Sequence, residues 1–174
     1  MTMFRKTLLA LAALIVLPAP LSAGPEKVEF PTSYRLWQSF GVLDRYDRKT
    51  VRFLYANPAA MAAETGKAIP NGAILVLEER KAKLGADGNP VRNAEGRFIA
   101  EDELVAVNVQ ERRAGWGAEY PAAKRNAEWE YASFLPNGQR NAAANIESCF
   151  TCHKPWVDQD YTLIFGAFVN AGKK

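Results

Sequence analysis

The chain has 174 residues, of which 48% are hydrophobic and 24% are charged, and its formal net charge is +3. This composition predicts one globular domain with a sizeable core. The high hydrophobic content excludes a disordered chain, and the composition also excludes a collagen-like one. A disulfide-rich chain is excluded because only two residues are cysteine. Basic residues are interspersed with acidic ones, so the sequence predicts no patch for a nucleic acid.

Residues 1–23 differ in composition from the rest of the chain. Arg5 and Lys6 precede an apolar run over 8–17, and prolines and small residues follow it. This order is typical of a cleaved signal peptide, and the run is shorter than the about 20 residues of a membrane-spanning helix. We therefore predict an exported, periplasmic protein whose residues 24–174 form a single domain, with no membrane association after cleavage. Cleavage removes two basic residues and no acidic one, which leaves a net charge of about +1.

The first half of this domain contains four predicted elements: a helix over 31–41, a strand over 50–56, a short helix over 58–65 and a strand over 73–84. Successive side chains of the strand over 50–56 point to alternate faces of the sheet. This alternation places Arg52 on the face opposite Val51 and Phe53.

The second half begins with a glycine-rich loop or hairpin tip over 85–96, and strands are predicted over 104–109 and 128–135. Four strands with a few short helices predict an α+β fold that is predominantly an antiparallel β-sheet. The charged runs over 78–81 and 111–113 are interpreted as solvated strand ends or turns.

The clearest chemical signal is C-x-x-C-H, formed by Cys149, Cys152 and His153. This spacing is typical of covalent haem attachment, in which two thiols join one porphyrin and the adjacent imidazole is the proximal ligand of the iron. We therefore expect one haem c with its iron. A zinc site is excluded because the chain has no further cysteine or histidine. A dithiol redox motif is disfavoured because no βαβ unit is predicted.

The sixth position of this iron has no obvious protein ligand. His153 is the only histidine, so ligation by two histidines of one chain is excluded. After signal cleavage the only methionine is Met61, which we interpret as core filler. An open position favours gas binding or redox catalysis over simple electron transfer.

Several short segments accompany the haem motif at the C-terminal end. The marks are SYRLW with Tyr34, Arg35 and Trp37; VRFLYANPAA with Arg52, Tyr55, Asn57 and Pro58; TGKAIPNGAILVLEE with Gly66 and Gly72; Trp129 before PNG; and Asp160 and Phe165 after the motif. In this order and spacing the chain resembles cytochrome P-460 and the related cytochromes c′-beta. The resemblance implies a mostly β-sheet fold.

The resemblance also implies roles for single residues. Arg52 matches the family's distal arginine, whose guanidinium can donate to a bound ligand or to developing negative charge. The alternative for Arg52 is a solvated strand arginine. The lysine that the hydroxylamine-oxidising members join to the porphyrin falls on Leu77, and Lys81 and Lys83 lie too far along the strand to replace it.

Those members also use a distal carboxylate for proton transfer. Its position falls on Val105 or Ala106, and Glu103 is displaced from it. An apolar residue here and the missing lysine favour reversible binding of a neutral diatomic over catalysis.

Three hypotheses follow from the resemblance. The first is an exported haem protein that binds nitric oxide or a similar small gaseous ligand. The second is an enzyme acting on hydroxylamine or nitric oxide, and the third is an electron shuttle with Met61 or a lysine as sixth ligand. A soluble cytochrome is the candidate redox partner, and the family's homodimer is neither favoured nor opposed by the sequence. Four aromatic residues are candidates for the pocket lining or for the core: Phe40, Phe53, Tyr55 and Trp129.

Overall fold

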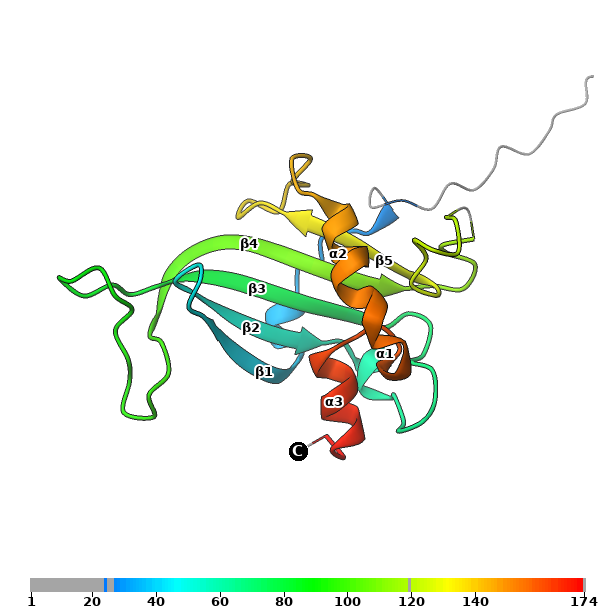
Figure 1. Cartoon of the computed structure of the whole chain (residues 1–174), viewed down its shortest axis with the longest axis horizontal. Coiled ribbons are helices and arrows are strands. Elements are labelled where there is room, and N and C mark those ends of the chain that lie inside the picture. Colours follow the sequence, from blue (N-terminus) through cyan, green and yellow to red (C-terminus); the bar gives the residue numbers. More distant parts are fainter. Residues whose placement is uncertain (1–23, 25–26, 119, 174) are drawn as a thin grey trace, which may run out of the picture.

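The computed structural model describes residues 24, 27–118 and 120–173. The predicted signal peptide, residues 1–23, lies outside the described residues. The fold is built on one antiparallel sheet in sequence order: β1 (Gln38–Arg45), β2 (Thr50–Ala56), β3 (Ile74–Ala82), β4 (Ala100–Arg112) and β5 (Trp129–Phe134). The five-stranded sheet confirms the predicted α+β, predominantly antiparallel class (Figure 1).

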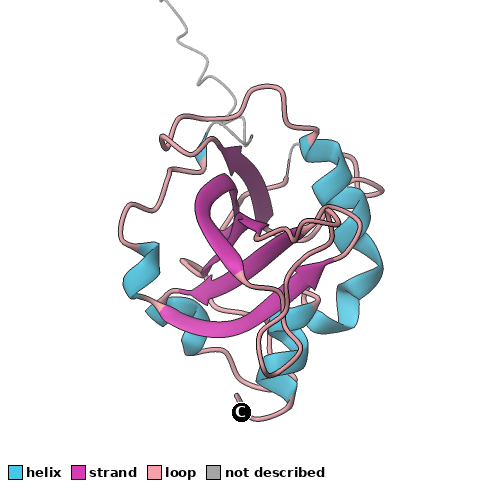
Figure 2. Cartoon of the chain, turned by 90° about the vertical axis from the view of Figure 1, so that its left-hand side faces the viewer, coloured by secondary structure: helices cyan, strands magenta, loops and turns pink. Residues whose placement is uncertain are grey.

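The helical segments are short: η2 (Tyr34–Leu36), α1 (Pro58–Met61), α2 (Ile146–His153), η3 (Lys154–Gln159) and α3 (Ile164–Asn170). Helices α2 and α3 lie against one face of the sheet, which we call the helix face (Figure 1). Figure 2 shows these helices on one side of the twisted sheet and a short helical turn on the other. Within the described ranges, no helix has the length and apolar character needed to cross a membrane.

The helix predicted over 31–41 is wrong. The chain forms only the turn η2 there and then enters β1, which pairs along β2. The register shifts between Ser39 and Gly41, and a side chain at Gly41 would place its Cβ 3.3 Å from Leu54 Cδ1. The near-helical spacing of the apolar residues is therefore outweighed by strand pairing with distant residues.

The remaining elements are present as predicted, and they differ from the predictions only in where they begin and end. Strand β2 has the predicted bounds, and β3 and β5 lie inside the predicted ranges. Strand β4 extends beyond 104–109 at both ends, and α1 ends at Met61, before the predicted residue 65. The loop between β3 and β4 is a long arm with two isolated bridges, Leu84 to Pro90 and Arg92 to Phe98.

The core is divided by the sheet. On the helix face, Trp129, Tyr131 and Phe165 form one cluster, against which Cys149 and Phe150 of α2 pack. On the opposite face, Tyr34 and Phe134 belong to a second cluster with valines of β3 and β4. Alternation along the strands therefore decides which side chains can approach α2.

The prediction that the two charged runs are solvated is wrong for Glu78, Glu79 and Glu111, which are 1%, 3% and 2% exposed. Lys81 and Arg113 in the same runs are exposed, as predicted. On the opposite face, Glu78 accepts hydrogen bonds from Tyr34, Arg35 and Arg80.

Burial raises the pKa of Glu78, but these donors outweigh it and leave the pKa below its ordinary value. Burial raises the pKa of Glu111 despite its ion pair with Arg113. Buried charges are tolerated here because partners satisfy them.

Candidate haem site

Helix α2 carries the C-x-x-C-H motif. It begins at Asn145, whose side-chain oxygen accepts a hydrogen bond from the Ser148 N–H at 3.2 Å. It ends after His153, where the chain passes into η3 and a proline removes a backbone donor. Cys152 and His153 follow Cys149 by three and four positions, so the three side chains lie on one side of the helix.

The two thiols are free and interact with each other electrostatically. Cys149 is half-buried and Cys152 is exposed. Burial raises the pKa of the Cys149 thiol, and the charge of Cys152 raises it further. Two free thiols one helical turn apart suit attachment to a single porphyrin.

The imidazole of His153 is held through one ring nitrogen. Its Nδ1 lies 2.6 Å from the backbone oxygen of Tyr161, and a carbonyl can only accept, so Nδ1 carries the proton. Burial lowers the pKa of His153, against the opposing effect of this carbonyl. The ring also packs at 5.0 Å from the ring of Tyr131. A neutral ring that donates from Nδ1 leaves Nε2 as the nitrogen that can bind a metal.

The helix face continues beyond α2 over a part of the sheet that none of the described helices covers (Figure 1). Strand register places Leu43, Arg52, Leu77 and Ala106 on this face, and all four are only half-buried. Helix α2, which carries the motif, lies on the same face of the sheet (Figure 1). We call this region the open sheet face.

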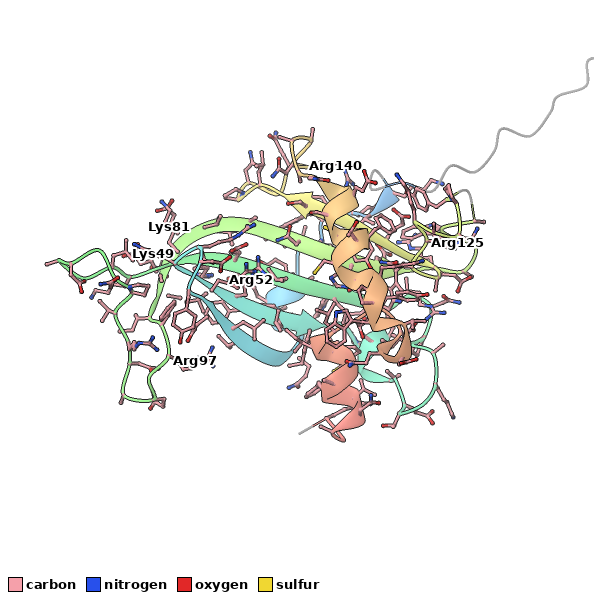
Figure 3. The ribbon with its side chains drawn as sticks, in the orientation of Figure 1. Lys49, Arg52, Lys81, Arg97, Arg125 and Arg140 are labelled. Atoms are coloured by element: carbon pink, nitrogen blue, oxygen red, sulfur yellow. The ribbon has the colours of Figure 1, made fainter. Side chains whose placement is uncertain are left out.

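Arg52 lies over the middle of the open sheet face (Figure 3). Its Nη2 is 3.3 Å from Oε2 of Glu79, and its Nε is buried without a hydrogen-bond partner in the part of the chain that the structure describes. The prediction that Arg52 and Phe53 point to opposite faces agrees with this placement. A half-buried guanidinium whose Nε is unpaired among the described residues can donate to an acceptor from a ligand.

Glu79 is the site residue that the sequence reasoning missed. It is directly opposite Arg52 on β2 and directly opposite Ala106 on β4. Its Oε1 accepts a hydrogen bond of 2.7 Å from the Thr50 hydroxyl. The signal was present in the sequence, since Glu79 has the same strand parity as Leu77, but its position in a charged run suggested solvent exposure.

Leu77, which the sequence predicts to match the family's crosslinking lysine, lies on the open sheet face two residues from Glu79. Lys81 has the same parity but forms an ion pair of 2.6 Å with Glu103, and both side chains are more than half exposed. Lys81 and Glu103 therefore neutralise each other near the ends of β3 and β4. Ala106 rather than the exposed Val105 faces the site.

The four aromatic candidates separate between the faces. Phe40 contacts Phe165 at 5.0 Å in the helix-face core, where Trp129 is fully buried. Tyr55 packs against Tyr34 on the opposite face, and Phe53 belongs to a third cluster with Val51. Met61 packs against the helix-face core. Core packing thus accounts for all four aromatic residues, and Phe53 and Tyr55 point away from α2.

A comparison with protein families identifies the chain. A sequence profile described as Cytochrome P460 matches residues 31–164, from the segment before η2 to the first residue of α3. The chain belongs to the cytochrome P460 family. No curated protein gives a significant match. Cytochromes of the P460 family carry c-type haem, which agrees with the C-x-x-C-H motif of this chain.

Several of the residues that carry the family resemblance have structural functions in this P460 sequence. Tyr34 and Arg35 hold buried Glu78 on the face away from α2. Asn57 begins α1, and its side-chain oxygen accepts from the N–H groups of Ala60 and Ile74 at 2.9 and 3.0 Å. These residues position the sheet and its connections rather than the site.

The site residues of this P460 chain fit a c-type haem. The fit rests on two free thiols, on an imidazole whose Nδ1 is hydrogen-bonded, and on the Nε of Arg52, which is unpaired within the described ranges. The half-buried apolar side chains of Leu43 and Leu77 offer contact to a porphyrin plane beside α2.

Proposed function

We propose that this protein is an exported mono-haem cytochrome whose iron binds nitric oxide or a similar small neutral ligand at an open sixth position. Cys149 and Cys152 would hold the haem through thioether bonds, and Nε2 of His153 would be the proximal ligand. The observation that carries the proposal is the anchored imidazole of the only histidine in the chain, carried by a helix on the same face of the sheet as Leu77 and Arg52. The haem supplies the iron at which a small ligand binds.

Arg52 is the residue that would recognise the ligand. Its buried Nε donates to no acceptor in the part of the chain that the structure describes, and a hydrogen bond to a bound diatomic slows dissociation. Its bond to Glu79 at 3.3 Å restrains the guanidinium on the open sheet face. The leucine at position 77 supplies no amine for a crosslink, which supports a haem with ordinary c-type electronics.

A second function, oxidation of hydroxylamine or nitric oxide, is favoured by one observation. Oxidation of hydroxylamine releases protons, and Glu79 is a buried carboxylate beside Arg52 that can accept them. The haem would supply the electron acceptor within the site, and a soluble cytochrome would receive the electrons. Electron transfer alone is the third hypothesis and requires Met61 or a lysine as a sixth ligand.

The location and partners belong to the same proposal. The segment 1–23 has the order of a signal peptide, so the site would work in the periplasm. A homodimer is compatible with the sequence.

The test is a titration of the purified ferrous holoprotein with nitric oxide and carbon monoxide, followed by absorption spectroscopy. The expected result is a high-spin spectrum at rest and saturable binding of both gases. A low-spin spectrum at rest would overturn the open position. Hydroxylamine-dependent reduction of an added cytochrome would favour the second function.

A further inference from the structure

The backbone oxygen of Tyr161 receives two side-chain donors. His153 Nδ1 lies 2.6 Å from it, and Gln110 Nε2 lies 3.0 Å from it. Gln110 projects from β4 onto the helix face and is 7% exposed. A buried amide of a strand and the imidazole of the haem helix are thus joined at a single carbonyl.

The loop that presents this carbonyl has an unusual backbone. Asp160, Tyr161 and Leu163 have φ values of 48°, 59° and 44°, in the left-handed region that non-glycine residues avoid. Such residues are strained and persist only where their surroundings fix them. The loop between η3 and α3 therefore requires anchors.

Two anchors are visible beside the carbonyl. The carboxylate of Asp160 accepts hydrogen bonds from Arg112 and, at 2.7 Å, from the backbone N–H of Ile69. Gln110 is the second anchor, because it holds the next residue, Tyr161, by its main chain. The carboxylate fixes one end of the left-handed segment, and the glutamine fixes the group that faces His153.

A second buried amide fixes the haem helix itself. Asn126 is fully buried, and its Nδ2 donates at 3.0 Å to the backbone oxygen of Phe150, which lies between the two cysteines. The same Nδ2 lies 3.0 Å from the hydroxyl of Tyr131, and Gln110 Nε2 is 3.4 Å from that hydroxyl. The two amides and Tyr131 form one buried network under α2.

We propose that Gln110 is a positioning residue for the proximal histidine, acting through the Tyr161 carbonyl. It fixes the carbonyl, and the carbonyl fixes the plane and the tautomer of the His153 imidazole. A short, well-directed bond at Nδ1 makes the opposite nitrogen more basic, which strengthens its bond to iron and stabilises the ferric state. The inference rests on the proposed function in one respect, that His153 binds haem iron.

The test is Gln110→Met, which conserves volume and removes the donor. Exposed Gln38 on β1 supplies the matched control, Gln38→Met. The measurements are the iron–histidine stretching frequency of the ferrous holoprotein by resonance Raman spectroscopy and the reduction potential. We expect a lower, broader stretching band and a higher potential in Gln110→Met, and no change in the control.

An unchanged stretching frequency and potential in a folded Gln110→Met holoprotein would overturn the proposal. Should this variant not fold, Gln110→Glu keeps the shape and removes the donor, and it is expected to shift both quantities in the same direction; unchanged values in that folded variant would equally overturn the proposal. Failure of the proposed function has a different signature, because a wild-type protein without histidine ligation shows no iron–histidine band.

Discussion

Arg52 and Glu79 face each other across β2 and β3, with Nη2 of the arginine 3.3 Å from Oε2 of the glutamate. The pair lies on the open sheet face, while Ala106 is directly opposite Glu79 on the other side. The sequence comparison with the family placed the distal carboxylate at Val105 or Ala106. The strand register now brings a carboxylate to the same level of the sheet from a neighbouring strand, so the face is less apolar than the sequence implied.

Replacing Arg52 by alanine is expected to speed dissociation of nitric oxide and carbon monoxide from the ferrous protein about fivefold. The reason is the loss of a hydrogen bond of about 1 kcal/mol from the buried guanidinium. Stopped-flow ligand replacement measures the rate. Exposed Arg48 in the turn after β1 supplies the control Arg48→Ala, which should leave the rate unchanged. Identical dissociation rates in Arg52→Ala and wild type would show that Arg52 does not bind the ligand.

The second function makes a prediction for Glu79→Gln. If hydroxylamine is oxidised, this isosteric change should lower turnover about 100-fold, because the proton acceptor is lost while the shape is kept. Reduction of an added soluble cytochrome measures turnover. The control is Glu103→Gln, since Glu103 is exposed and paired with Lys81. Equal turnover in Glu79→Gln and wild type would exclude Glu79 as the base.

Glu78, next to Glu79 in sequence, is expected to act on stability alone. Glu78→Gln should lower the free energy of unfolding by about 3 kcal/mol, because Tyr34, Arg35 and Arg80 lose a buried carboxylate. Denaturant unfolding measures the loss, and the haem spectrum should be unchanged. Exposed Glu64, in a surface pair with Lys67, gives the control Glu64→Gln, expected within about 0.5 kcal/mol of wild type. A changed haem spectrum in Glu78→Gln would contradict the separation of the two faces.

The attachment of the arm between β3 and β4 should depend on pH. Hydrogen bonds from Arg97 lower the pKa of Asp44 below its ordinary value, against the effect of burial. A lowered folded-state pKa contributes stability above the unfolded value of about 3.9, and this contribution is lost as pH falls through the folded value. Asp44→Asn should therefore be destabilising at pH 7 and lose its effect in acid.

Denaturant unfolding of Asp44→Asn across this pH range measures the effect, with exposed Asp158→Asn as the control. A destabilisation by Asp44→Asn that is independent of pH would show that the carboxylate charge is not involved.

Local patterns were sufficient for much of the fold. The alternation over 50–56 predicted β2 with its observed bounds, and C-x-x-C-H predicted the residues that α2 presents on one side. The first strand was missed because its stability comes from pairing with β2 and not from its own spacing.

The burial of Glu78 and Glu79 was also missed, and the reason is again distance along the chain. Glu78 is paired with Tyr34 and Arg35, which lie 44 and 43 residues away, and Glu79 with Thr50, 29 residues away. A charged run predicts solvent exposure unless such partners are known. Only the register of the sheet brings them together, so the sequence alone did not predict the Arg52–Glu79 pair.

The central claim is an open, histidine-ligated c-type haem without a lysine crosslink, and the absorption spectrum of the ferrous holoprotein tests it most directly. We expect an ordinary c-type haem spectrum with high-spin bands at rest and a new spectrum on addition of nitric oxide. The red-shifted ferrous band characteristic of the crosslinked family members would contradict the reading of Leu77, and low-spin bands at rest would contradict the open position.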